Sequence, residues 1–162
     1  MKYPIELADV SLSFAQFRAL DQLNLRVAEG EIHGFLGPKG AGKSTTIRAL
    51  LGLLHPTGTV RVLGQDPRSN PEVLRHVGYV PGDVTLWPQL TGRETLTALA
   101  KLRVREVDAQ REQELIDAFQ LDPYKKCRDY STGNRRKVLL VSAFLRRRNC
   151  LFWTNPPRVW IH

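Results

Sequence analysis

The 162-residue sequence has only two cysteines, Cys127 and Cys150, and their spacing is not that of metal ligands. We therefore expect two free thiols in a reducing cytosol and no disulfide framework. Long apolar runs are also missing, since the longest, such as residues 138–145, are far too short to span a membrane. The N-terminus, from Met1 to Pro4, lacks the apolar centre of a secretion signal. These absences favour a globular domain, and the length is enough for one sizeable core.

The balance of charge is basic, with a formal net charge of +8. Such a charge raises the possibility of a nucleic-acid partner. The basic residues are spread along the chain without interleaved aromatic residues, and the cluster Arg146-Arg147-Arg148 is the exception. We therefore favour a solvated basic surface and expect no nucleic acid as partner.

A glycine-rich segment from Gly37 to Ser44 fits the pattern G-x-x-x-x-G-K-[ST]. The mostly apolar residues 32–36 before it predict a short buried strand. Residues 43–54 after it place apolar side chains at a helical period, at Ile47, Leu50, Leu51 and Leu54. Strand, glycine loop and helix follow in the order that a P-loop requires.

The residue types suit the binding of a triphosphate. Glycines let backbone N–H groups approach an anion, and the N-terminus of the following helix is positive. Lys43 is expected to reach the β and γ phosphates, and the Ser44 hydroxyl to bind Mg²⁺. A glycine-rich turn that matches by accident is the alternative, and we favour a site made by Gly37, Pro38, Lys39, Gly40, Ala41, Gly42, Lys43, Ser44 and Thr45.

The remaining elements follow from residue patterns. Strands are predicted over residues 5–12, 20–27, 59–63 and 77–81, and a brief helix over residues 71–76. A helix is predicted from Thr91, with Thr91 as N-cap, Glu94 completing a capping box, and one apolar face. Another is predicted over residues 108–120, and an apolar helix after residue 137. The apolar faces of the first two comprise Leu96, Leu99, Ala100 and Leu102, and Leu115, Ile116 and Phe119.

Tyr130-Ser131-Thr132-Gly133-Asn134 precedes that last helix. Together with the P-loop, the Val-Gly-Tyr-Val-Pro run at residues 77–81 and the helical insert, it resembles the ATPase subunit of ABC transporters, most closely exporters of drugs or similar compounds. The pentapeptide is similar to the Leu-Ser-Gly-Gly-Gln signature of that family. The resemblance covers residues 1 to about 147.

The resemblance implies roles for further residues. Phe14 matches the aromatic residue that stacks on adenine, and Phe17 is the second choice. Ser131, Thr132, Gly133 and Asn134 match signature positions, which close over ATP held by the opposite subunit. An ordinary N-cap turn is the alternative for that segment on its own. Residues 87–90, with Trp87, lie where the family contacts its membrane partner, and a plain loop is the alternative.

The implied cofactors are ATP and Mg²⁺. The implied partners are a membrane-spanning permease subunit and a second ATPase subunit in a head-to-tail dimer. The implied location is the inner face of the cell membrane, on the cytoplasmic side. The implied fold is α/β: a RecA-like P-loop core, mainly a parallel sheet with an N-terminal antiparallel β part, plus a helical insert, and incomplete at its C-terminus. Within one partial domain, residues 1–85 and 133–147 form the core, residues 86–132 the helical subdomain, and residues 148–162 a tail unlike the family.

Three positions depart from the family pattern. Lys39 stands where Asn is usual, which should not prevent phosphate binding. Gly82 stands where the family has a Gln that contacts Mg²⁺ and the attacking water, and Asp83 could replace it only with a backbone shift. After residue 147 the family has a strand ending in Asp-Glu, for Mg²⁺ and water activation, and later a His. This chain has no acid after Asp129, so we expect no catalytic residue, and we expect His162 to be an exposed terminal residue.

The tail has a possible origin in the reading frame. Suitable synonymous codons for residues 148–162, read one nucleotide earlier, give Pro-Glu-Leu-Leu-Ile-Leu-Asp-Glu-Pro-Thr-Ser-Gly-Leu-Asp-Pro. We hypothesise a single-nucleotide deletion near codons 145–147, or a sequencing error. The chain as written should then bind ATP weakly and hydrolyse almost none, and its folding is in question because strands of a parallel sheet are lost. The alternatives are a non-catalytic nucleotide-binding protein that pairs with an intact ATPase subunit, a basic nucleic-acid-binding protein, or a pseudogene product without function.

Overall fold

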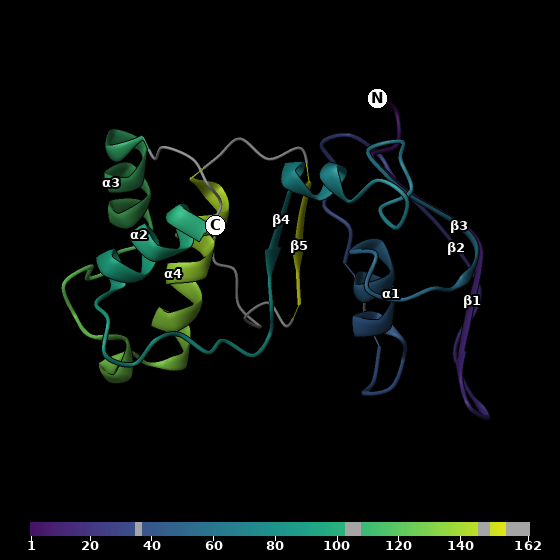
Figure 1. Ribbon diagram of the computed structural model, residues 1–162, viewed down its shortest axis with the longest axis horizontal. Coiled ribbons are helices and arrows are strands. Elements are labelled where there is room, and N and C mark those ends of the chain that lie inside the picture. Colours follow the sequence, from purple (N-terminus) through teal and green to yellow (C-terminus); the bar gives the residue numbers. More distant parts are fainter. Residues whose placement is uncertain (35–36, 103–107, 146–149, 155–162) are drawn as a thin grey trace. The chain divides into compact units, whose positions relative to one another are not determined.

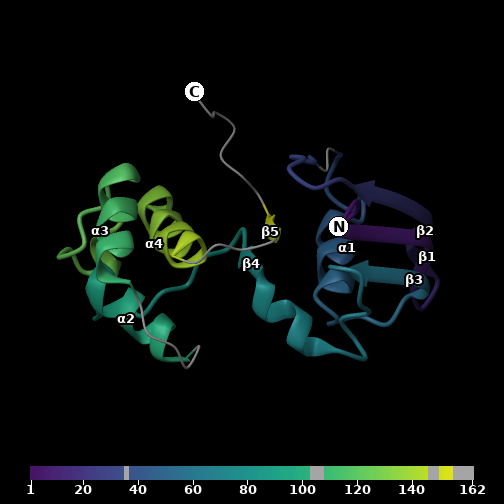
Figure 2. The same ribbon diagram turned by 90° about the horizontal axis from the view of Figure 1, so that it is seen from above.

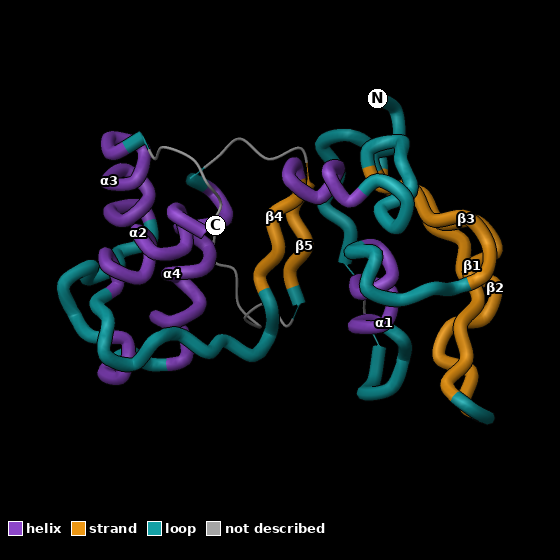
Figure 3. The backbone as a smooth tube through the Cα atoms, in the orientation of Figure 1, coloured by secondary structure: helices purple, strands orange, loops and turns teal. Residues whose placement is uncertain are grey.

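The computed structural model describes residues 1–34, 37–102, 108–145 and 150–154. Predictions that concern Phe35, Leu36, the cluster at residues 146–148, His162 and most of the tail lie outside these ranges. The chain divides into two compact units, residues 1–77 and 78–162, and each is described by itself (Figure 1). Helices and strands both contribute, as predicted for an α/β fold (Figure 3). None of the described helices combines the length and apolar character needed to cross a bilayer.

The first unit is built on a three-stranded antiparallel sheet. Its strands are β1 (Ile5–Phe14), β2 (Phe17–Val27) and β3 (Thr57–Val62), in the order β2-β1-β3. Ile5 faces Val27 on one side and Val62 on the other. This sheet is the antiparallel β part that the sequence predicted, with β1 and β2 each a few residues longer than expected.

An irregularity in β1 keeps its apolar side chains on the inner face. The register shifts between Leu7 and Val10, where Asp9 has a φ of 51°. The extra residue allows Leu7 and Val10, three positions apart, both to be buried. Gly58 of β3 lies against the Asp9 carbonyl, where a Cβ would overlap the backbone.

Helix α1 (Lys43–Leu50) lies along one face of this sheet (Figure 2). Its inward side is made by Thr46, Ile47, Ala49 and Leu50, all buried. The unit also contains the short 3₁₀ helix η1 (Pro71–His76), at the predicted residues. The sheet and α1 together bury the side chains that form the core, namely Ile5, Leu7, Val10, Leu20, Ile47, Ala49, Leu50, Val60 and Val62.

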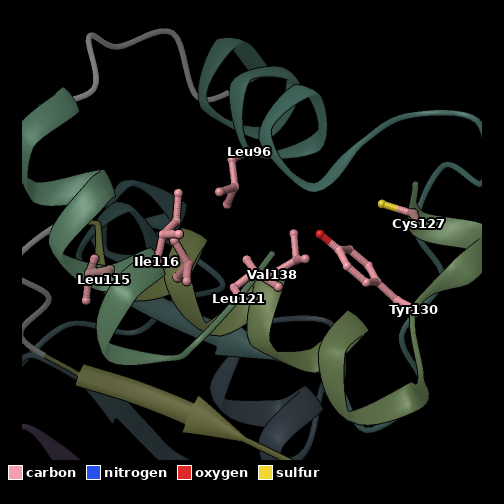
Figure 4. Close-up of a cluster of buried hydrophobic side chains, with 8 residues drawn as sticks. Leu96, Leu115, Ile116, Leu121, Cys127, Tyr130 and Val138 are labelled. Atoms are coloured by element: carbon pink, nitrogen blue, oxygen red, sulfur yellow. The ribbon is translucent and has the colours of Figure 1, made fainter. Parts of the chain in front are cut away.

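The second unit is mainly helical. It contains α2 (Gly92–Leu102), α3 (Ala109–Ala118), the 3₁₀ turn η2 (Cys127–Asp129) and α4 (Thr132–Phe144). Figure 4 shows side chains from these elements gathered into one buried cluster. Its members are Leu96, Leu115, Ile116, Leu121, Cys127, Tyr130, Val138 and Val141.

Side-chain caps define where two of these helices begin. The Thr91 N–H donates to Glu94 Oε2 at 2.7 Å, and the Glu94 N–H donates to Thr91 Oγ1 at 3.2 Å. This reciprocal pair confirms the predicted capping box at the start of α2. The Asp108 carboxylate accepts from the N–H groups of Gln110 and Arg111 and caps α3 in the same manner.

A second, two-stranded sheet is formed by β4 (Val77–Val80) and β5 (Cys150–Trp153). The Thr154 N–H donates to the Val80 carbonyl at 3.0 Å. Because this bond joins the C-terminal ends of both strands, the pair is parallel (Figure 1). Leu151 and Trp153 pack with Val80 and with α4 residues Leu140 and Ala143 in a small apolar cluster.

Two sequence expectations are wrong. The sequence predicts a buried strand at residues 32–36. Ile32 is 99% exposed, and residues 32–34, the part of the run that the structure describes, are not in a strand. An interior strand needs a hydrogen-bonded neighbour, and no described strand pairs with this run. Leu102 was placed on the apolar face of α2 but is 71% exposed, because it is the last residue of that helix.

Candidate nucleotide-binding site

The glycine loop turns sharply before α1. The Ala41 N–H donates to the Pro38 carbonyl at 3.2 Å, which makes Lys39 and Gly40 the central residues of a turn. Gly40 has a φ of 91°, the left-handed value that the third position of a type II turn requires. Residues 37–41 are all exposed, so the outer side of the loop is open to a ligand.

Gly42 is the position where only glycine fits. It is the N-cap of α1 and has a φ of 77°. A Cβ built there would lie 2.7 Å from the Ala19 carbonyl oxygen and 2.9 Å from the Leu20 side chain. The glycine therefore lets the loop press against β2 while the helix starts.

The side chain of Lys43 is turned back over the loop. Its Nζ donates to the Gly37 carbonyl at 2.5 Å and to the Pro38 carbonyl at 2.6 Å. An ammonium ion has three donors, so these two bonds leave one N–H for an anion. The lysine thus lies inside the curve of the loop, where the sequence predicted a contact with phosphate.

The first turn of α1 supplies the remaining groups. Thr46 is buried, and its Oγ1 donates to the Gly42 carbonyl at 2.9 Å, which fixes the turn. Ser44 is exposed and Thr45 half-buried. The N–H groups of a first turn have no partner within their own helix, and no acidic residue lies in this one. The arrangement therefore suits an anion.

The residues described around this loop offer one oxygen ligand for Mg²⁺, the Ser44 hydroxyl. Among the residues that the structure describes, no group of three or more His, Cys, Asp or Glu side chains could hold a metal ion. A serine hydroxyl with nucleotide phosphates and waters can complete the octahedral shell of Mg²⁺. The site therefore fits the ion only when a nucleotide contributes most of its ligands.

Phe14 lies at the end of the β1–β2 hairpin in the same unit. It pairs across the hairpin with Phe17, and their exposed fractions are 48% and 59%. Ala15, between them, has a φ of 50°. Two exposed aromatic rings are thus available for stacking, and the choice of Phe14 over Phe17 as the adenine contact stays a prediction.

The signature-like segment begins α4. Ser131 is the N-cap, and its Oγ accepts from the Asn134 N–H at 3.2 Å. Thr132 and Gly133 are exposed in the first turn, and Asn134 is half-buried. The N-cap turn that the sequence offered as the ordinary interpretation is therefore present, and a role toward nucleotide stays a prediction.

Tyr130, just before that turn, is held by a hydrogen bond and by burial of its ring. Its hydroxyl donates to the Asp122 carbonyl, and its ring is buried in the core of the second unit (Figure 4). Burial raises the pKa of the Tyr130 phenol to about 12. A Cβ on Gly92 would overlap the same hydroxyl. No residue pattern predicts this contact, because the acceptor is a main-chain oxygen.

Arg136 connects α4 to the loop after β4. Its Nη2 donates to the Gly82 carbonyl at 3.2 Å, across 54 residues of sequence. Gly82 therefore contributes its main-chain carbonyl to this contact. Trp87, in the same loop, is 45% exposed. The Leu90 carbonyl accepts from the Cys127 N–H at 2.8 Å, which ties this loop to η2.

The structure thus brings Phe14 and residues 37–45 into the first unit, and Ser131–Asn134 into the second.

Comparisons with known proteins bear on both segments. The family described as ABC transporter matches residues 20–157, most of the chain. Similar curated proteins and a solved structure also belong to this family.

The daunorubicin/doxorubicin resistance ATP-binding protein DrrA of Streptomyces peucetius is 39% identical over 145 residues, which cover 86% of this chain and 44% of that protein. The bacitracin transport ATP-binding protein BcrA of Bacillus licheniformis is 33% identical over 94% of this chain and 51% of its own length. A solved structure of an ATP-binding subunit of an ABC transporter superposes with a TM-score of 0.73 and 29% identity, over 87% of this chain and 61% of that one. The chain thus spans about half the length of these two relatives.

Proposed function

We propose that this chain, which belongs to the ABC transporter family, binds ATP as part of an exporter's nucleotide-binding subunit. The observation that carries the proposal is Lys43, whose ammonium group lies against the carbonyls of Gly37 and Pro38. It stands inside a loop of exposed main chain at the N-terminus of α1. A phosphate group placed there meets backbone N–H groups, the positive helix end and one free ammonium N–H.

The proposed ligand set combines this geometry with the family resemblance. The loop residues 37–42 and the amides of Lys43, Ser44 and Thr45 bind the phosphates, and Phe14 stacks on the base. Mg²⁺, when bound, would neutralise part of the phosphate charge. Ser44 gives it the only protein oxygen in this set.

The partners are proposed from the family. A permease subunit with membrane spans would receive the surface around Trp87. A second ATPase subunit would present its own nucleotide to Ser131, Thr132, Gly133 and Asn134. The names of the two relatives, one for resistance and one for transport, support an exporter of drug-like compounds on the inner face of the cell membrane.

We further propose that this chain hydrolyses almost no ATP. Thr154 and Asn155 follow the strand β5, where the family has Asp and Glu. Neither a hydroxyl nor an amide can act as the general base that an ionised carboxylate provides. The altered reading frame described above accounts for these residues, and resequencing the gene around codons 145–147 tests it. A frame that is intact, with codons that do not yield Asp-Glu after a one-nucleotide shift, contradicts it.

Binding is tested by titrating the full chain with ATP in an isothermal calorimeter. Lys43→Ala should weaken binding at least tenfold, because it removes a charge-assisted contact at the centre of the site. Lys101→Ala is the matched control, since Lys101 is an exposed lysine in the second unit and should leave binding unchanged. Equal affinity of the Lys43 variant and the original chain would refute the proposed site.

Hydrolysis needs a separate measurement. Release of inorganic phosphate should stay at background for the chain as written. It should rise by orders of magnitude in a variant whose residues after 147 carry the Asp-Glu sequence of the alternative frame. Clear turnover by the chain as written would contradict the proposal that it is inactive, without affecting the binding site.

A further inference from the structure

The segment around the glycine loop contains no acidic residue. Between Glu31 and Asp66 the chain has no Asp or Glu, while it has Lys39, Lys43, Arg48 and Arg61. Within this segment positive charge is therefore not balanced locally. A site of this kind favours a ligand with several negative charges.

Lys39 is the unusual member of this group. It is the second residue of the turn from Pro38 to Ala41, and it is exposed. In the described part of the chain, neither a hydrogen bond nor an ion pair involves its side chain. It differs in this from Lys43, which is bound to two carbonyls.

The two lysines stand close together along the loop. Lys43 Nζ lies 2.6 Å from the carbonyl oxygen of Pro38, which belongs to the peptide group that precedes Lys39. The Cα of Lys39 is about 3 Å from that oxygen, since the peptide is trans and planar. The side chain of a lysine is long enough, at about 6 Å, to bring its ammonium group beside that of Lys43.

We propose that Lys39 is a second phosphate-binding lysine, and that it makes ATP binding by this chain largely independent of Mg²⁺. The terminal phosphate carries about −1.5 to −2 charge at neutral pH, which two lysines can balance. Among the residues described around the loop, the Ser44 hydroxyl is the one oxygen ligand offered to Mg²⁺, so removal of the ion would break few contacts with the described protein groups. This inference depends on the proposed function, because it concerns the same site.

The test compares the Kd of ATP for the full chain in the presence of Mg²⁺ and in the presence of EDTA. The original chain should bind with constants that differ by no more than about fivefold. Lys39→Gln, which removes the charge and keeps the length, should weaken binding in EDTA by about five- to tenfold, the effect of one charge-assisted contact. In Mg²⁺ the same change should cost about twofold or less.

Three further variants separate the possible results. Lys39→Asn should behave like Lys39→Gln, because a change of charge and not of shape is responsible. Lys101→Gln, an exposed lysine in the other unit, should have no effect in either condition. Lys43→Ala should weaken binding at least tenfold in both conditions.

The inference is overturned if EDTA weakens binding to the original chain by more than about fivefold. It is equally overturned if Lys39→Gln changes the Kd in EDTA by less than threefold while Lys43→Ala still weakens binding at least tenfold. In both cases the proposed site stands. If the Lys43→Ala chain binds ATP as tightly as the original chain, the proposed function itself is refuted.

Discussion

The hydroxyl of Tyr130 donates a hydrogen bond to the main-chain carbonyl of Asp122, eight residues earlier. Tyr130 directly precedes the N-cap of α4, and Asp122 lies in the segment that follows α3. The bond therefore fixes where α4 begins relative to the end of α3. It also satisfies a hydroxyl that would otherwise be buried without a partner.

Tyr130→Phe should reduce the free energy of unfolding by about 1 kcal/mol, since it removes the hydrogen bond between the Tyr130 hydroxyl and the Asp122 carbonyl. Urea denaturation followed by circular dichroism measures the change. Tyr124→Phe is the control: the Tyr124 residue is 74% exposed, so its loss of a hydroxyl should cost less than about 0.5 kcal/mol. Equal stabilities of the two variants would show that the Asp122 bond contributes nothing.

The same phenol gives an alkaline signature. Its pKa rises from 10.0 to about 12 on folding, so the folded state retains a proton that the unfolded state releases. Its contribution to stability is complete below pH 10 and is lost as the pH rises toward 12. Unfolding curves at pH 9 and pH 11 should show a steeper loss for the original chain than for Tyr130→Phe. Parallel losses in the two chains would contradict the raised pKa.

Gly42→Ala should destabilise the first unit by about 2–3 kcal/mol. It combines a left-handed backbone with the overlap on the Ala19 carbonyl, 2.7 Å away. Gly30→Ala is a matched control because Gly30 has the same φ, 77°, and no atom within 4 Å of the added Cβ. It should cost only about 1 kcal/mol. Thermal unfolding of both variants tests the difference, and a Gly42 variant no weaker than the Gly30 variant would disprove the close contact.

Asp66 and Arg68 form an ion pair, with Oδ2 and Nη2 2.6 Å apart. Hydrogen bonds from Arg68 hold the pKa of the Asp66 carboxyl below its usual 3.8. The stabilisation is therefore present above about pH 4 and is lost as the pH falls through the lower, folded value. Asp66→Asn should cost about 1 kcal/mol at pH 7 and less at pH 3. A difference that stays constant between these pH values would argue against the pair.

Cys150, in β5, should react slowly with iodoacetamide. Burial raises the pKa of its thiol to about 11, so little thiolate exists at pH 8. Cys127 is 1% exposed and should be slower still. Mass spectrometry of tryptic peptides should show little labelling of either cysteine in buffer and full labelling in urea. Rapid labelling of Cys150 in buffer would contradict its place beside β4.

Local patterns were read from the sequence with most success. The capping box of Thr91 and Glu94, the brief helix at Pro71–His76 and the strand at Val77–Val80 depend on neighbours within a few residues. The loop from Gly37 to Ser44 is equally local, because the positive φ values of Gly40 and Gly42 serve the turn and the helix start within this segment.

Distant contacts were beyond such patterns. The bond from Arg136 to the Gly82 carbonyl spans 54 residues, and its acceptor is a main-chain atom that no residue type announces. The pairing of β5 with β4 is also not predicted, since the residues after 147 are unlike the family and their short apolar run, Cys150–Trp153, does not identify its partner strand. Ile32 shows the converse error, because apolar residues form a strand only when another strand pairs with them.

The exposure of Ile32 has a practical consequence for anyone who handles this protein. An apolar β-branched side chain that projects almost wholly into water is a point where copies of the chain can associate. Purified material should therefore form oligomers as its concentration rises. Ile32→Lys should shift the onset of light scattering to higher concentration.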